Sequence, residues 1–229
     1  MTKQLIPDYI GHRKRIKERY KTIGLDNWSD YEVLEFALSF ALPRKDTKPI
    51  AKELISKFKS IDKVLNANKE ELVKVKGISE HAALFLSFLK DISRAYLKKA
   101  LYNQDLLSSP DAVYNYLKAA LKGLADEEFK VLFLDNRNHL LTVETLQTGT
   151  VNKSVVYPRK VVERALHNHA ASVIIAHNHP AGSLKPSGDD IKVTKTIKDA
   201  LRIVEIELLD HILIGGNGYF SFIENGVVF

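Results

Sequence analysis

The feature that most constrains the fold is a change in hydrophobic pattern about halfway along this 229-residue chain. From Tyr9 to about Lys99, apolar residues recur at helical spacing and no strand alternation appears. From Phe129 onward, short apolar runs rich in β-forming residues alternate with helical segments. We therefore expect two domains, an all-α domain over residues 1–101 and a domain over residues 106–229 in which a sheet is layered with helices.

The second half supplies the strands and helices for such a sheet. Its apolar runs are separated by turn residues such as Asp135-Asn136-Arg137-Asn138, and Pro158 marks the start of a helix. The first two strands are expected to pair as a hairpin. The predicted strands are residues 129–134, 140–146, 171–176, 205–214 and 219–223, and the predicted helices are residues 111–124, 158–169 and 188–204.

Charge is unevenly distributed between the two halves. Residues 1–100 hold 21 Lys and Arg against 13 Asp and Glu, a net charge of +8. Residues 101–229 hold 13 against 15, a net charge of −2. A basic half favours an anionic partner such as nucleic acid, although a surface of solvated lysines produces the same count.

Composition excludes several classes of site. The chain has no cysteine, so disulfides, thiolate catalysis and Cys-containing zinc sites are excluded, and any metal must be held by His, Asp or Glu. No run approaches the roughly 18 consecutive apolar residues of a membrane span, and Met1-Thr2-Lys3-Gln4 does not begin a secretory signal. We therefore expect a cytoplasmic protein with no membrane partner.

Two histidines follow the most apolar predicted strand. His177 and His179 come directly after the run from Ala171 to Ala176, which is too apolar to face solvent. Side chains at i and i+2 of a strand share a face, so both imidazoles can reach one metal ion. Pro180 then ends the strand, and Gly182 permits the chain to turn back toward the rings.

Asp190 is the candidate third ligand, and it has a second interpretation. Ser187 and Asp190 open the predicted helix from Gly188, and their spacing is that of an acidic capping pair. Beside His177 and His179, however, the same carboxylate completes a set of three metal ligands. Three protein ligands leave zinc a fourth position for water, which is typical of a catalytic site. The pKa of such a water can fall to about 7.

A second His-x-His pair serves as an internal control. His167 and His169 have the same spacing but lie at the end of the predicted helix from Pro158. Positions i and i+2 of a helix point about 200° apart and chelate poorly. We therefore interpret this pair as a polar helix end.

The run His177-Asn178-His179-Pro180, with Ser187-Gly188-Asp189-Asp190 seven residues later, resembles the JAMM motif of the JAB/MPN metalloprotease family, His-x-His-x₇-Ser-x-x-Asp. The sequence around this motif resembles the RadC family more closely still, and this resemblance covers nearly the whole chain. The other segments that resemble RadC signatures are Gly149-Thr150-Val151, Val156-Tyr157-Pro158-Arg159, Pro186-Ser187, Leu208-Leu209-Asp210-His211-Ile212, Gly11-His12-Arg13, Ser29-Asp30-Tyr31-Glu32 and Pro43-Arg44-Lys45-Asp46-Thr47.

This resemblance implies a fold, a cofactor and site roles. Residues 106–229 would adopt the cytidine-deaminase-like α/β arrangement of JAB/MPN domains. One zinc ion per chain would bind to His177, His179 and Asp190, and Ser187 would hydrogen-bond the oxyanion of a tetrahedral intermediate. The family also uses a glutamate at the start of an earlier strand as general base. In that family the glutamate usually stands in a Glu-x-Phe pattern, which points to Glu127 as the general base here, with Glu128 as the alternative.

The segment from Glu71 to Ala83 resembles a helix-hairpin-helix, whose glycine turn presents backbone N–H groups to a DNA phosphate. Lys74, Lys76, Gly77 and Ser79 are the candidate DNA contacts. Typical hairpins carry Gly-hydrophobic-Gly, whereas this one has Ser79 in place of the second glycine. A hairpin that serves only packing is the alternative.

Three functions are open at this point. The first is a zinc metallopeptidase or isopeptidase whose peptide or isopeptide substrate is unknown. The second is a DNA-binding module associated with repair or recombination, in which the zinc domain is structural or binds a partner. The third is a zinc hydrolase acting on a non-peptide bond. His and carboxylate ligands would also admit manganese or iron in place of zinc.

Overall fold

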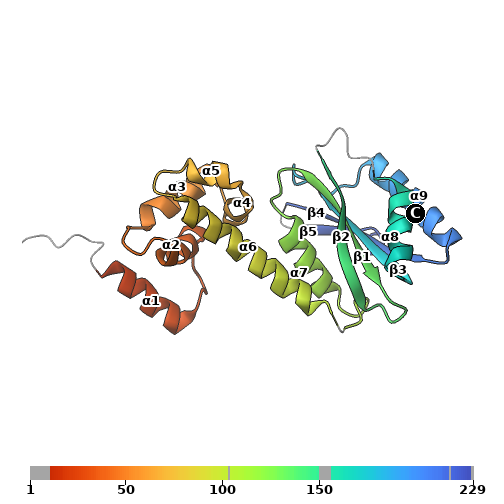
Figure 1. The fold of residues 1–229 in the computed structure, drawn as a ribbon, viewed down its shortest axis with the longest axis horizontal. Coiled ribbons are helices and arrows are strands. Elements are labelled where there is room, and N and C mark those ends of the chain that lie inside the picture. Colours follow the sequence, from red (N-terminus) through yellow and green to blue (C-terminus); the bar gives the residue numbers. More distant parts are fainter. Residues whose placement is uncertain (1–10, 103, 150–155, 217, 228–229) are drawn as a thin grey trace, which may run out of the picture. The chain divides into compact units, whose positions relative to one another are not determined.

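The computed structural model describes residues 11–102, 104–149, 156–216 and 218–227 (Figure 1). The chain divides into two compact units, one up to Asp91 and the other from Ile92 onward. The division lies within one helix, α6 (Glu80–Ala100). The predicted domain boundary between residues 101 and 106 stays a prediction.

The first unit is helical, as the sequence predicts. Its fully buried leucines, among them Leu34, Leu54 and Leu86, form one apolar core. Ser29 begins α2 because its backbone N–H and its hydroxyl both donate to the Glu32 carboxylate, at 2.9 and 2.8 Å. The helices are α1 (His12–Ile23), α2 (Asp30–Ala41), α3 (Lys48–Phe58), α4 (Ile61–Asn66), α5 (Lys69–Val73) and the first part of α6.

The second unit is built on a five-stranded mixed sheet with the strand order β2-β1-β3-β4-β5. The predicted hairpin of β1 and β2 is present, β3 pairs antiparallel with β1 and parallel with β4, and β5 pairs antiparallel with β4. The strands are β1 (Glu127–Leu134), β2 (Leu140–Gly149), β3 (Ser172–Asn178), β4 (Glu207–Gly215) and β5 (Gly218–Ser221), and the helices are α7 (Pro110–Leu121), α8 (Pro158–His167) and α9 (Gly188–Ile203).

Both faces of this sheet are covered, which explains why β3 is buried along its whole length. Ile174 and Ala176 pack toward α7, whereas Val173 and Ile175 pack toward α8 and α9. Alternation along the strand therefore places His177 on the face of α8 and α9. The layers are visible in Figure 1, where α7 and the pair α8 and α9 flank the sheet.

The coarse fold prediction is thus confirmed: a helical first part and a mixed α/β second part. The finer predictions, a helix-hairpin-helix and a cytidine-deaminase-like arrangement, stay predictions. Residues 150 and 151 of the Gly149-Thr150-Val151 segment lie outside the described residues. Among the helices described, none has the length and apolar character needed to cross a membrane.

Candidate metal centre

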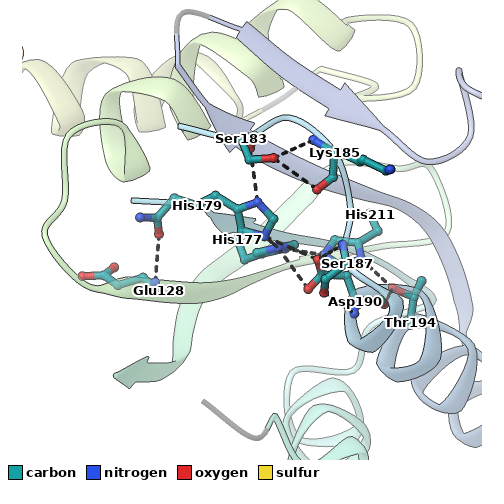
Figure 2. A network of polar contacts seen from close by, with 10 residues as sticks. Glu128, His177, His179, Ser183, Lys185, Ser187, Asp190, Thr194 and His211 are labelled. Atoms are coloured by element: carbon teal, nitrogen blue, oxygen red, sulfur yellow. Dashed lines mark hydrogen bonds and ion pairs between the residues drawn. The ribbon is translucent and has the colours of Figure 1, made fainter. Parts of the chain in front are cut away.

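Strand β3 brings the two predicted histidines to one point. His177 is the residue before the last of β3, and His179 follows two residues later. Their side chains are only 1% and 18% exposed. The backbone N–H of His179 donates to the Ile214 carbonyl at 2.9 Å, which holds this residue against β4. The two Nε2 atoms lie 3.1 Å apart and face the same space (Figure 2).

Asp190 enters this space from the first turn of α9. Its Oδ1 lies 3.4 Å from His177 Nε2, and its Oδ2 lies 3.4 Å from His179 Nε2. The same Oδ2 accepts the Ser187 backbone N–H at 2.6 Å, and Ser187 Oγ accepts the Asp190 N–H at 3.1 Å. The capping pair is therefore present, and the capping carboxylate is the one that lies beside the two histidine rings. The cap orients the carboxylate toward the rings.

The three side chains fit a metal ion. One ligand atom from each of His177, His179 and Asp190 can be chosen so that all three lie within 4.8 Å of one another. Tetrahedral zinc with bonds of about 2.0–2.2 Å places its ligand atoms about 3.3–3.6 Å apart. The two Nε2 atoms are 3.1 Å apart, and each lies 3.4 Å from a different oxygen of the Asp190 carboxylate, so these separations are close to such edges.

Electrostatics favours the ionised carboxylate that ligation by Asp190 needs. Burial raises the pKa of Asp190, but hydrogen bonds and charge from His177 and His179 outweigh it and hold the pKa well below its ordinary value. The Asp190 carboxylate in turn raises the pKa of His179. The carboxylate is thus ionised at neutral pH and attracts a positive charge to this point.

His179 is also held in the orientation that ligation requires. Its Nδ1 lies 3.2 Å from the Ser183 carbonyl oxygen. A carbonyl only accepts, so Nδ1 carries the proton and the lone pair of Nε2 faces His177 and Asp190.

A third histidine, His211, belongs to the site and was missed as a site residue in the sequence. It lies on β4, is fully buried, and its Nε2 is 2.8 Å from His177 Nδ1. Its Nδ1 is 2.6 Å from Thr194 Oγ1 on α9, and Thr194 Oγ1 donates to the Asp190 carbonyl. Burial, followed by the charge of His177, lowers the pKa of His211 well below its ordinary value.

One signal for His211 was present in the sequence, since His211 and Asp210 interrupt the otherwise apolar run over residues 208–214. For Thr194 there was only its position four residues after Asp190 on the same helix, which is a weak signal.

The two candidate glutamates at the start of β1 have different surroundings. Glu127 lines a cavity of about 450 Å³ together with His177, Asp190 and His211. Glu128 instead forms an ion pair with Lys130, with Oε2 and Nζ 2.9 Å apart. Strand alternation accounts for the difference, because Glu127 shares its face with Phe129, which is paired with His177 across the sheet.

Asn178, between the two histidines, ties the start of β1 to this site. Its Oδ1 accepts the Glu128 N–H at 2.8 Å, and its Nδ2 donates to the Asp126 carbonyl at 3.1 Å. These bonds bracket Glu127 on both sides and so keep its backbone beside the histidines.

The predicted DNA contacts lie in the first unit, between α5 and α6. Lys74 and Lys76 are exposed. Gly77 has φ +97°, and a Cβ there would lie 2.8 Å from Ile50 Cδ1, so the turn requires glycine. Ser79 Oγ accepts the Ala82 N–H at 3.2 Å and thereby caps α6.

The second His-x-His pair, His167 and His169, lies at the end of α8. Both residues are exposed, as expected of a polar helix end.

Comparison with known proteins finds similarity both to a domain family and to a whole protein. A family model described as RadC-like JAB domain matches residues 107–227. UPF0758 protein FN0909 of Fusobacterium nucleatum subsp. nucleatum is 37% identical over 228 residues, covering 96% of this chain and 98% of that protein.

Proposed function

The chain belongs to the RadC family, and from this premise we propose that it is a zinc-dependent metallohydrolase that cleaves a peptide or isopeptide bond. The observation that carries the proposal is the His177, His179 and Asp190 cluster at a cavity that Glu127 also lines. A structural zinc site is closed by four protein ligands, whereas three ligands beside an open cavity are typical of a catalytic one.

His177, His179 and Asp190 would hold the zinc ion. Bound there, zinc would lower the pKa of a coordinated water to about 7 and polarise the carbonyl of the substrate. The largely buried carboxylate of Asp190 balances part of the positive charge, and the apolar walls of the cavity, Phe129 and Val193, exclude bulk water.

Glu127 is the proposed general base. It is half-buried at the cavity, and it would accept a proton from the attacking water and pass it to the leaving amine. Glu128 is less suited to this role, because its carboxylate forms an ion pair with Lys130. Glu127 is not part of that ion pair.

Ser187 is the proposed oxyanion donor. Its Oγ accepts the N–H of Asp190, which leaves the hydroxyl proton for another acceptor. An exposed hydroxyl next to the metal ligand Asp190 could donate this proton to the oxyanion of a tetrahedral intermediate.

The test separates metal binding from turnover. Zinc content by plasma mass spectrometry should be about one per chain in the wild type and should fall in His177→Ala and Asp190→Ala. Glu127→Gln should keep zinc and lose turnover of peptide and isopeptide substrates by at least about 100-fold. Glu128→Gln, one residue away, is the matched control and should keep both. Zinc retained by the His177 and Asp190 variants would remove the site, and full turnover in Glu127→Gln would remove the proposed base.

A second candidate function, DNA binding by the hairpin before α6, is favoured by the geometry at Gly77 and Ser79. The glycine turn and the Ser79 cap leave exposed Lys74 and Lys76 next to the first turn of α6, where N–H groups can receive a phosphate. Duplex binding by the full chain should weaken steeply with salt and weaken further in Lys76→Glu. Binding that ignores both changes would contradict this function.

A further inference from the structure

Helix α1 carries the densest positive charge in the first unit. Its 12 residues include six Lys and Arg, at positions 13, 14, 15, 17, 19 and 21, against one acid, Glu18. Some of these cations have intramolecular roles, since Arg19 pairs with Glu32 at 2.6 Å and Lys21 with Glu18 at 2.9 Å. Arg13 donates to the backbone carbonyls of Leu42, Pro43 and Lys45. The remaining excess of charge on one short helix favours a polyanionic partner.

Aromatic rings lie in a row beside these cations. The ring centroids of Tyr20 and Phe36 are 4.7 Å apart, and those of Phe36 and Phe40 are 5.1 Å apart. Phe36 is buried, whereas Tyr20 and Phe40 are 43% and 58% exposed. Lys17 Nζ lies 5.8 Å from the centroid of the Phe40 ring. The Phe40 ring is nearly perpendicular to that of Phe36, at 78°, so Tyr20 and Phe40 expose two separate rings beside a buried one, with the Lys17 cation over the Phe40 ring.

A cavity of about 350 Å³ is next to this surface. It is lined by Ile16 and Ser39, the sequence neighbours of Lys17 and Phe40, and by Arg13, Arg44 and Lys45. The acidic groups at this cavity are Glu35, which is buried and bonded to His12, and exposed Asp46. Arg13 donates to three backbone carbonyls and Lys45 Nζ to the Gly77 carbonyl at 3.4 Å, but these bonds leave the charges in place, and three cations exceed the two acids and favour an anionic ligand.

We infer that the α1–α2 face binds single-stranded nucleic acid, with bases stacked on Phe40 and Tyr20 and phosphates held by the cations of α1 and of the 43–47 loop. Exposed rings favour unpaired bases, because every base offers a π face for stacking while bases inside a duplex are covered by their neighbours. The cations supply the salt-sensitive part of the affinity. This surface differs from the hairpin before α6, and the inference does not rest on the metal site.

The test is a titration of the full chain against fluorescein-labelled 20-mers of deoxythymidine and uridine, a duplex 20-mer and polyglutamate. We expect either single strand to bind at least tenfold more tightly than the duplex, and polyglutamate to bind weakly because it lacks bases. The tighter of the two single strands tells whether DNA or RNA is the natural ligand. The ring centroids of the single tryptophan, Trp28, and of Phe36 are 5.6 Å apart, so the fluorescence of Trp28 should change when a single strand binds.

Variants at Phe40 test the stacking directly. Phe40→Ala and Phe40→Leu should each weaken binding about tenfold, whereas Phe40→Trp should retain it. Lys17→Gln should lower the salt dependence by about one phosphate contact. Tyr157→Ala is the matched control, since Tyr157 is also an exposed ring with a cation, Arg159, 5.8 Å from its centroid.

Phe40 is more than half exposed, so these variants should fold, and circular dichroism checks this. Phe40→Leu with wild-type affinity would overturn the inference, as would equal binding of duplex and single strand. Polyglutamate binding as tight as that of the oligonucleotides would also overturn it and would indicate an acidic protein partner instead.

Discussion

Thr194 has one hydroxyl proton, and the acceptor of that proton decides which nitrogen of His177 is protonated. The hydroxyl donates to the Asp190 carbonyl, so Thr194 Oγ1 must accept from His211 Nδ1. A neutral His211 then has only an acceptor at Nε2, which receives the proton of His177 Nδ1. The lone pair of His177 Nε2 is left for the metal. Such outer partners of a ligating histidine tune metal affinity.

Replacing Thr194 therefore tests the chain of hydrogen bonds without touching a ligand. Thr194→Val keeps the shape but removes the hydroxyl, and we expect zinc affinity to fall about 10–100-fold because His177 loses its fixed tautomer. Competition with a chromophoric chelator measures this affinity. Thr194→Ser keeps the hydroxyl and should bind zinc as the wild type does. Equal affinity in the Val and Ser variants would show that this chain has no influence on the site.

Glu32 makes stability depend on pH at the start of α2. Backbone hydrogen bonding from Ser29, together with the Arg19 guanidinium, lowers the pKa of Glu32 from 4.5 to about 2, against the opposing effect of burial. A lowered folded-state pKa stabilises the protein above the unfolded value and is lost as pH falls through the folded value. The contribution is thus complete above pH 4.5 and absent near pH 2.

We expect Glu32→Gln to cost about 1 kcal/mol at pH 7, since Arg19 is partly exposed and its contribution is screened. The difference from the wild type should shrink between pH 4.5 and pH 2. Urea unfolding across this range measures it. Glu18→Gln, which removes an exposed pair with Lys21, should change stability by only a few tenths of a kcal/mol. A Glu32→Gln penalty that stays constant down to pH 2 would contradict this account.

At the scale of elements, the site depends on how closely the 179–187 loop packs on the end of β4. A Cβ added to Gly215 would lie 2.5 Å from the Ser183 carbonyl oxygen, and that oxygen holds His179 Nδ1. Gly215→Ala must therefore displace the loop that orients a ligand. We expect a loss of about 1–3 kcal/mol of stability and zinc binding at least about tenfold weaker.

Gly188 offers the matched control for this prediction. A Cβ there meets nothing within 4 Å, and alanine suits the first turn of α9. Gly188→Ala should leave both the melting temperature and the zinc affinity close to wild type. If Gly215→Ala behaves like Gly188→Ala in thermal unfolding and chelator competition, the close contact has no role in the site.

The elements themselves were largely predictable, because their signals are local. The apolar run before His177 predicts a buried strand, Pro158 and the Ser187 pair predict helix starts, and both sets of elements are present. The same reasoning separated His177 and His179 on a strand from His167 and His169 on a helix end.

The hydrogen-bonded surroundings of the site were not predictable in this way. The bond from His177 to His211 joins residues 34 positions apart, and it depends on the parallel register of β3 and β4. The bond from Asn178 to Glu128 spans 50 positions and depends on the pairing of β1 with β3. Periodicity predicts that strands exist, but register and strand order follow from tertiary packing.

At the scale of the whole molecule, the second compact unit begins at Ile92, within α6. Leu101, which is fully buried, belongs to the core between α7 and the sheet, and Leu97 packs against it. Arg94 on α6 donates to the carbonyls of Ala119 and Ala120 at 2.9 and 2.7 Å. These bonds provide partners for carbonyls in the last turn of α7, which have none within the helix. The last turns of α6 therefore belong to the unit that carries the candidate metal site.

Two fragments test this assignment. A fragment of residues 92–229 keeps Arg94, Leu97 and Leu101, whereas a fragment of residues 106–229 loses all three. Removing a fully buried leucine costs about 2–5 kcal/mol, and the lost caps of α7 add to this. We expect the shorter fragment to melt at least about 10 °C lower, or to unfold without a cooperative transition, when followed by circular dichroism. In the longer fragment, Leu101→Ala should reproduce most of the difference in melting temperature, because it removes the same buried side chain from the core. Equal melting temperatures for the two fragments would place the boundary of this unit after α6, where the change in hydrophobic pattern predicts it.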